Sequence, residues 1–204
     1  MNKSDDDQRL IERARAGDMA AAGDALVRHR DRLRRMVDAR LDRRVRGRVD
    51  PSDVLQDGFA DAIAKLPGYL ADPKLPVFLW LRLVVGERLA KIHRDHLGAQ
   101  IRDATREVTL YRGPMPAASS AALAAHLLGR ETTPTQAAVR AERLLRLQEA
   151  LNALDPIDRE ILSLRHFEEL THAEAARVLD IEASAAAKRY VRALKKLKDV
   201  LAGL

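Results

Sequence analysis

Side chains that could do covalent or metal chemistry are sparse in this sequence. The chain has no cysteine, which excludes disulfides, thiolate zinc sites and thiol nucleophiles. His93 and His96 are spaced to share one helix face, but no third ligand follows them at a fixed spacing. Asp103 and the pair Ser119–Ser120 belong to no nucleophile-elbow pattern, and no glycine-rich phosphate loop is present. The sequence therefore predicts no catalytic residue, no metal site, no cofactor and no enzyme.

Acidic and amide side chains form one regular pattern. Spacings of i, i+3, i+4 and i+8 relate Asp53, Gln56, Asp57 and Asp61. In a helix these four side chains share one face, opposite an apolar stripe. The helix dipole accounts for an acid in the first turn, such as Asp53, but not for Asp57 or Asp61, which lie further along. The face is therefore a candidate contact surface for another molecule.

Basic side chains are concentrated in two blocks, although the net charge is only +6. Ten arginines and three aspartates lie between Arg28 and Arg48, and every charged residue from Ser184 to Lys198 is basic. Each block stands beside an acidic one. A solvated helix face explains either block alone, whereas the two together favour a polyanionic partner such as nucleic acid.

The elements that must position these side chains are predicted to be helices. Strand-type alternation is nearly absent, and Ala, Leu, Arg and Glu dominate. Two helical stretches are separated around Gly17–Asp18, and a third begins at Asp50–Pro51, an N-cap followed by proline. The breakers between Pro67 and Pro76 predict a loop, after which a helix runs from Val77 to Gly98 with Trp80 in the core.

Composition divides the chain into two helical parts. We expect domains at 8–98 and 136–204, joined by a flexible linker at 99–135 that is rich in Ala, Ser, Gly and Pro and holds one short helix, Ser119–Leu128. The longest wholly apolar run, Val77–Leu81, is far too short to span a membrane, and the N-terminus is polar. The expected fold class is all-α, two small helical bundles with no membrane insertion.

The C-terminal part predicts a helix-turn-helix. Asp155–Pro156 opens one helix, and Thr171 with Glu174 forms a capping box that opens a short one. A tight turn at Asp180–Ile181 then leads to a basic helix from Ser184, in which Val191 is expected to be buried. The second helix of such a motif enters the major groove of DNA. Two core helices of a bundle without DNA-binding activity are the alternative.

These segments, in this order, resemble a known family. The basic helix is followed by DPSDVLQDGFADAIAKLPGYL, FLWLRL, a linker, LDPIDREILSLRHFEELTHAEAARVLD and a second basic helix. The ordered set, over residues 8–98 and 136–204, is similar to bacterial extracytoplasmic-function (ECF) sigma factors, the minimal promoter-specificity subunits of RNA polymerase. The resemblance implies a cytoplasmic protein that binds core polymerase and promoter DNA to initiate transcription. Many members of the family are sequestered by an anti-sigma factor.

The resemblance also implies roles for particular residues. The face of Asp53, Gln56, Asp57 and Asp61 matches the one that grips the clamp helices of the largest polymerase subunit; the flap is a further contact. The loop Gly68–Leu75 matches the place where a base flipped from the minus-ten promoter element is caught. The residues implied in minus-ten binding are Gly68, Tyr69, Lys74, Arg82, Arg88, Lys91 and Arg94. Those implied in minus-thirty-five binding are Ser184, Lys188, Arg189, Arg192 and Lys195.

Two other functions remain open from the sequence. An autonomous transcription regulator would combine the same helix-turn-helix with an unrelated helical domain and bind duplex DNA without polymerase. A helical interaction protein, such as an adaptor, would carry its basic faces incidentally. A sigma factor co-elutes with core polymerase and directs initiation, a regulator shifts DNA alone, and an adaptor does neither.

Overall fold

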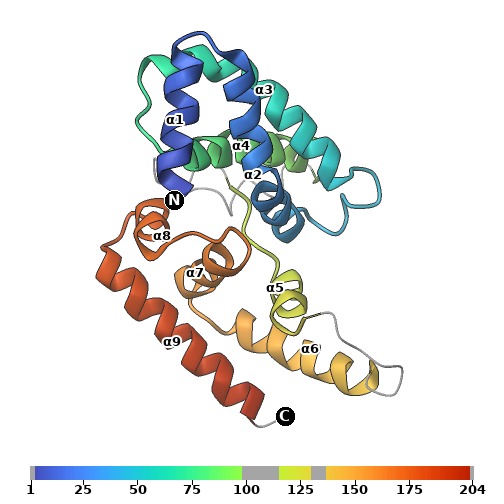
Figure 1. Ribbon diagram of the computed structural model, residues 1–204. Coiled ribbons are helices and arrows are strands. Elements are labelled where there is room, and N and C mark those ends of the chain that lie inside the picture. Colours follow the sequence, from blue (N-terminus) through green and yellow to red (C-terminus); the bar gives the residue numbers. More distant parts are fainter. Residues whose placement is uncertain (1–2, 98–114, 130–136, 203–204) are drawn as a thin grey trace. The chain divides into compact units, whose positions relative to one another are not determined.

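Helices build every regular element that the structure describes. The computed structural model describes residues 3–97, 115–129 and 137–202, and the expected all-α fold is confirmed (Figure 1). Asp103 and most of the expected linker lie outside these residues. No helix in the described part of the chain is long and apolar enough to cross a membrane.

The chain divides into two compact units. Unit 1 comprises Met1–Val37 and Leu41–Pro116, and unit 2 comprises Asp38–Arg40 and Ala117–Leu204. Helices α1 to α4 begin in unit 1 and have the bounds Lys3–Arg15, Met19–Arg40, Pro51–Ala71 and Val77–Leu97. Unit 2 holds α5 (Ser120–Leu127), α6 (Ala137–Asn152), α7 (Pro156–His166), α8 (His172–Leu179) and α9 (Ala183–Ala202).

Side-chain caps begin the helices where the sequence predicts them. The Asp18 carboxylate accepts from the Ala21 amide at 3.2 Å to open α2, and the Asp50 carboxylate accepts from the Ser52 amide at 2.7 Å to open α3. Asp155 caps α7 in the same way, and Thr171 opens α8 with a complete capping box. Each cap satisfies backbone donors that have no partner within the helix, so these boundaries are fixed locally.

The predicted loop at Pro67–Pro76 is mostly wrong. Helix α3 continues through Pro67 to Ala71, so the connection to α4 is only residues 72–76. A proline inside a helix costs about 3 kcal/mol because it removes one hydrogen bond and crowds the preceding turn. Burial of Leu66 and Tyr69 on either side offsets that cost, and the Arg15 side chain donates to the Leu70 carbonyl at 2.7 Å.

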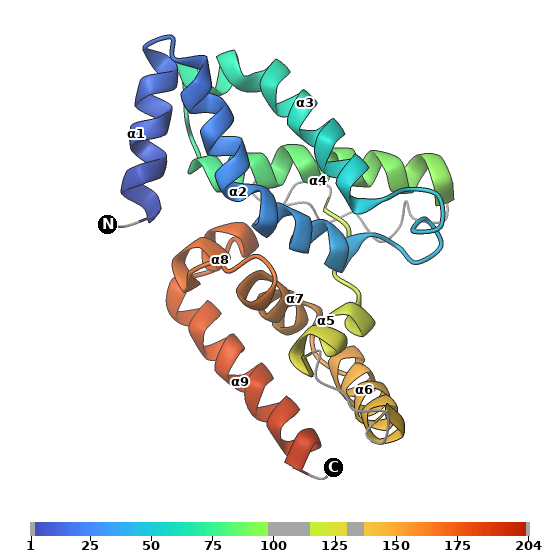
Figure 2. The ribbon, with the colours of Figure 1, turned by 45° about the vertical axis from the view of Figure 1, so that its right-hand side comes forward.

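Helices α3 and α4 form the core of unit 1 and lie side by side (Figure 2). The closest approach is at Gly58, where an added Cβ would lie 2.9 Å from Val85 Cγ2 and 3.3 Å from Val85 Cα. Any larger side chain there would push the two helices apart. The apolar stripe of α4, with Leu81, Val85 and Leu89 fully buried, packs against α3 through this contact.

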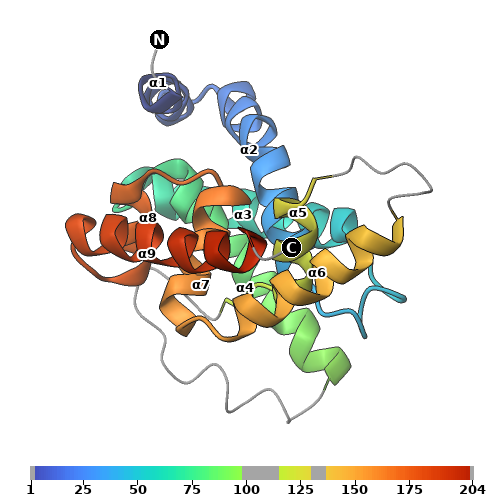
Figure 3. The ribbon, with the colours of Figure 1, turned by 90° about the horizontal axis from the view of Figure 1, so that it is seen from below.

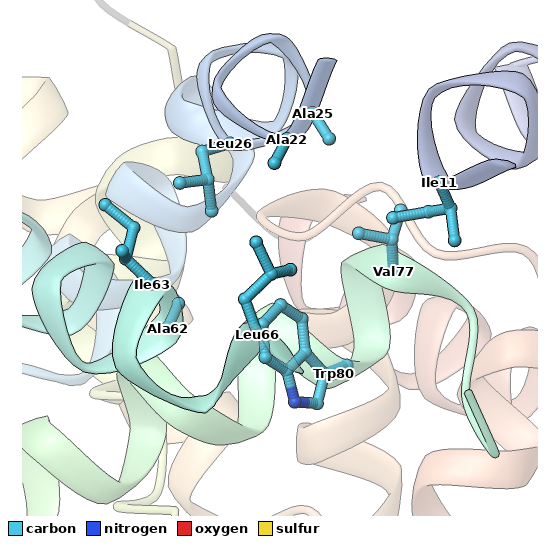
Figure 4. Close-up of a pocket in the computed structure, with 9 residues that line it drawn as sticks. All are labelled: Ile11, Ala22, Ala25, Leu26, Ala62, Ile63, Leu66, Val77 and Trp80. Atoms are coloured by element: carbon cyan, nitrogen blue, oxygen red, sulfur yellow. The ribbon is translucent and has the colours of Figure 1, made fainter. Parts of the chain in front are cut away.

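A small apolar pocket remains among the four helices of unit 1 (Figure 4). The Trp80 ring lies beside Leu66 at its wall, so Trp80 is half-buried in packing rather than fully enclosed. All of the lining side chains are apolar: Ile11, Ala22, Ala25, Leu26, Ala62, Ile63, Leu66, Val77 and Trp80. The pocket offers no polar group that could orient a ligand.

Part of the expected linker belongs to unit 2. The short helix predicted at Ser119–Leu128 is confirmed as α5, and it lies against α6 (Figure 3). Leu123 and Ala124 are fully buried in one cluster with Leu147 and Leu151. Residues 117–129 are therefore folded, because two apolar side chains in an Ala-rich stretch are enough to bury one face of a two-turn helix.

A buried histidine makes the stability of unit 1 depend on pH. The Asp42 backbone N–H donates to His93 Nε2 at 3.2 Å, and burial lowers the pKa of His93 below 6.5. The unfolded chain therefore binds a proton at a higher pH than the folded chain does. We expect the free energy of unfolding to be fully retained above pH 6.5 and to fall as the pH drops through and below that value.

Urea unfolding between pH 8 and pH 5 measures this effect. His93→Gln should flatten part of the pH dependence, and His96→Gln, at an exposed position of the same helix, is the matched comparison. A wild-type stability that is flat across this range would contradict the role of His93.

Candidate protein and nucleic-acid interfaces

Helix α3 presents the acidic face that the spacing predicts. Asp53, Gln56 and Asp57 are exposed, and Asp61 is half-buried on the same side. Val54, Leu55, Gly58 and Ala62 are buried on the opposite side. Because the Asp50 cap and Pro51 fix where the helix begins, they also fix the rotation at which these polar side chains emerge.

An ion pair joins Arg88 and Asp61, which the resemblance assigns to different partners. The Nε and Nη2 atoms of Arg88 donate to Asp61 at 2.8 and 2.7 Å, and its Nη1 lies 3.8 Å from Asp57. The hydrogen bond from Arg88 lowers the pKa of Asp61 below its ordinary value, and the same contact raises the pKa of Arg88. The acidic groups left facing solvent are therefore Asp53 and Asp57, and Arg88 is partly occupied within unit 1.

The connection between α3 and α4 is held by stacked aromatic rings. Tyr69 stacks on Trp80 with ring centroids 4.2 Å apart and an interplanar angle of 13°. The Tyr69 hydroxyl donates to the Leu75 carbonyl at 2.9 Å, and burial raises its pKa to about 12. Tyr69 is 7% exposed, so it braces residues 72–76 from inside and does not itself present a surface for a base.

The predicted minus-ten residues are not all at the surface. Arg82 is fully buried, which contradicts its predicted contact with DNA. The burial of Arg82 could have been predicted from the sequence, because Arg82 shares the helical stripe of Phe78, Val85 and Leu89. The four remaining exposed members are Gly68, in the last turns of α3, and Lys74, Lys91 and Arg94.

Unit 2 contains the helix-turn-helix. After α8, Asp180 adopts the left-handed conformation with φ 54° and ψ 47°, as a tight turn into α9 requires. Ala186, Ala193 and Leu197 are buried on the inner face of α9. The exposed side chains Ser184, Lys188, Val191 and Lys195 fall within an arc of about 60° on the opposite face.

Asp158 holds the two arginines of α9. This carboxylate is fully buried at the start of α7, and it accepts from Arg189 at 2.8 Å and from Arg192 at 2.9 and 3.0 Å. Burial alone would raise the pKa of Asp158, but the hydrogen bonds from the arginines outweigh it and keep the pKa below its ordinary value. Asp158 does not stand out in the sequence as a functional residue, because an acid in the first turn of a helix already has a sufficient local explanation in the helix dipole.

We expect Asp158→Asn to increase binding to duplex DNA of any sequence. Without the carboxylate, Arg189 and Arg192 become available to phosphates. Each added phosphate contact steepens the dependence of the logarithm of affinity on the logarithm of salt concentration by about 0.9, so the slope should rise by up to about 1.8. Fluorescence anisotropy on a scrambled duplex at several salt concentrations measures it.

Asp155→Asn is the matched control. Asp155 carries the same charge but lies 3.5 Å from Arg189 and is half exposed, and asparagine caps a helix as well as aspartate does. The control should change the salt slope little. An unchanged slope in Asp158→Asn would show that the ion pairs do not limit the arginines.

No metal centre accompanies these surfaces in the part of the chain that the structure describes. Within residues 3–97, 115–129 and 137–202, no three His, Cys, Asp or Glu side chains are grouped so that they could hold a metal ion. His93 and His96 do not form a pair, because His93 is buried and His96 is exposed. What the arrangement can do is bind other molecules by charge, through α3 and the end of α4 in unit 1 and through α9 in unit 2.

Comparison with known proteins identifies the helix-turn-helix. Residues 144–197, which span most of α6 and continue through α7 and α8 into α9, match the family model described as Sigma-70, region 4. None of the curated proteins compared with this chain matches it.

Two solved structures are similar to the chain over most of its length. The structure of CnrH in complex with the cytosolic domain of CnrY is 25% identical with a TM-score of 0.54, and the match covers 97% of this chain and 98% of that one. The sigma factor RpoE in complex with the anti-sigma factor NepR from Bartonella quintana is 18% identical with a TM-score of 0.45, covering 83% and 89%.

The region 4 match, on a chain whose described elements are all helices in two units, supports a sigma factor of RNA polymerase. The ordered sequence motifs resemble the extracytoplasmic-function type within that class, and the match with CnrH covers nearly all of both chains.

Proposed function

We propose that this sigma factor docks on core RNA polymerase with the exposed face of α3 and reads a two-part promoter with its two units. The observation that supports this proposal best is the coincidence of the region 4 match with a helix-turn-helix whose outward face is basic. In unit 1 the corresponding binding surface is the acidic face of α3. A binding factor that positions an enzyme needs these two surfaces and no catalytic group of its own.

The proposed contacts follow the exposed side chains. Asp53, Gln56 and Asp57 would meet basic side chains on the clamp helices of the largest subunit, giving register and association rate more than affinity. In unit 1 the braced connection at 72–76 would receive the flipped minus-ten base, because a preorganised loop lowers the cost of ordering. The basic side chains that would hold the adjacent backbone are Lys74, Arg88, Lys91 and Arg94.

In unit 2 the outward face of α9 would enter the major groove of the minus-thirty-five element. Ser184, Lys188 and Lys195 face outward, and Arg189 and Arg192 lie at the flank beside Asp158. The arginines would reach phosphates or bases only by exchanging their partner. Contact of unit 2 with the polymerase flap, sequestration by an anti-sigma factor and a cytoplasmic location complete the proposal.

Reconstitution with core polymerase tests the function. The purified chain should co-elute with core polymerase and direct transcription from start sites that map downstream of a shared two-part element. A chain that shifts duplex DNA alone and fails to join core polymerase would instead support an autonomous regulator. A chain that does neither would support an adaptor.

A further inference from the structure

Val191 is an apolar residue on the outward face of α9, whose other exposed side chains are polar or basic. The sequence pattern predicts a buried side chain, but Val191 is 63% exposed and the prediction is wrong. The buried stripe of α9 runs through Ala186, Ala193 and Leu197, and Val191 lies on the opposite side. It is flanked by Lys188 and Lys195 on the same outward face.

An exposed valine on a surface needs no explanation by itself, since single apolar residues are common there. The position of Val191 on α9 is what indicates a role in DNA recognition. It is the ninth residue of α9, and it lies one turn from both Lys188 and Lys195 on the face that a helix-turn-helix inserts into the major groove. Its β-branched side chain has few rotamers, so its two methyl groups are held in nearly fixed directions.

The major groove offers one apolar group for such a side chain. Guanine, adenine and cytosine present hydrogen-bonding atoms at their edges, whereas thymine also presents its C5 methyl group. Arginine recognises guanine by donating two hydrogen bonds. The arginines of α9, Arg189 and Arg192, are instead held at the flank by Asp158. Val191 can therefore recognise a base through apolar contact. Lys188 and Lys195, on either side of it, carry ammonium groups suited to phosphates.

We propose that Val191 is a specificity-determining residue that packs against the C5 methyl group of a thymine in the upstream promoter element. This inference rests on the proposed function, and it names the chemical group read at one position. Burial of one methyl group between the valine and the base accounts for about a fourfold gain in affinity.

Substituting deoxyuridine for thymine tests the contact directly, because uracil keeps the base pair and lacks only the methyl group. The full chain is assembled with core polymerase, the upstream element is found by mapping start sites, and each thymine in it is replaced in turn. We expect one replacement to weaken promoter binding about fourfold. Val191→Ala should weaken binding to the thymine promoter by a similar factor and make the holoenzyme indifferent to that replacement.

Val139→Ala is the matched control. Val139 is 49% exposed in the first turn of α6 and does not belong to the outward face of α9, so its replacement should leave both affinity and the response to uracil unchanged. The proposal is overturned if the upstream element contains no thymine, if no uracil replacement affects the wild type, or if Val191→Ala keeps the full response. Failure of the holoenzyme to bind any promoter would overturn the proposed function itself, and is a distinct result.

Discussion

Replacing both Asp53 and Asp57 by arginine is expected to abolish binding to core RNA polymerase while leaving unit 1 folded. Both side chains are exposed on α3, and the contact of Asp57 with Arg88 is long at 3.8 Å. The double replacement turns two negative charges into two positive ones opposite a basic partner surface. Like charges brought together at an interface cost several kcal/mol, so affinity should fall at least about 100-fold.

A titration of labelled chain with core polymerase measures this loss, and circular dichroism monitors the fold. Asp24→Arg combined with Asp31→Arg is the control, since it makes the same change of charge at two exposed positions of α2. The control should retain most of its affinity. Equal losses in the two double variants would attribute the effect to total charge, and unchanged affinity in the α3 variant would remove this face from the proposed interface.

Helix starts and the turn of the helix-turn-helix could be predicted because their causes are local. Asp50 with Pro51, and Thr171 with Glu174, carry their partners within three residues, so no tertiary information is needed. The same holds for the left-handed Asp180, since aspartate tolerates that conformation better than most residues.

Features that depend on burial could not be predicted from local pattern. Pro67 reads as a break in the sequence, but the burial of Leu66 and Tyr69 stabilises the helix through it. The sequence predicts helix α5 but places it in a flexible linker, whereas its burial against α6 makes it part of unit 2. The apolar pattern of the sequence places Val191 in the core, one position off the true stripe, because the alanines at 186 and 193 contribute to the core of unit 2 and carry little weight in such a pattern. Small residues mark a close helix approach more than they mark hydrophobicity.

Ion pairs between helices are a second feature of the candidate interfaces that the sequence pattern could not predict. Arg88 meets Asp61 across 27 residues, and Arg192 meets Asp158 across 34. Each charge reads as available in the sequence, yet each is partly neutralised by a partner on another helix. Fewer charged groups therefore remain exposed on each face than the sequence suggests. Substitutions of these exposed groups should have the largest effects.

Lys188→Glu combined with Lys195→Glu should therefore eliminate recognition of the upstream element. Both lysines are exposed on the outward face of α9, on either side of Val191. Two phosphate contacts are lost and two negative charges are introduced beside the DNA backbone. We expect at least about a 100-fold loss of promoter affinity, which is about 2.8 kcal/mol, and a shallower dependence on salt by about 1.8.

Promoter binding by the assembled holoenzyme, measured over a range of salt concentrations, distinguishes this effect from general repulsion. Arg143→Glu with Arg146→Glu changes the charge of unit 2 equally at two exposed positions of α6, outside the outward face of α9. It should lower affinity only slightly, because charges beyond about 10 Å from the DNA are screened at 0.1 M salt. If this control loses as much as the α9 variant, or if the α9 variant keeps its affinity, the outward face is not the surface that meets the upstream DNA, and the orientation of the helix-turn-helix must be assigned differently.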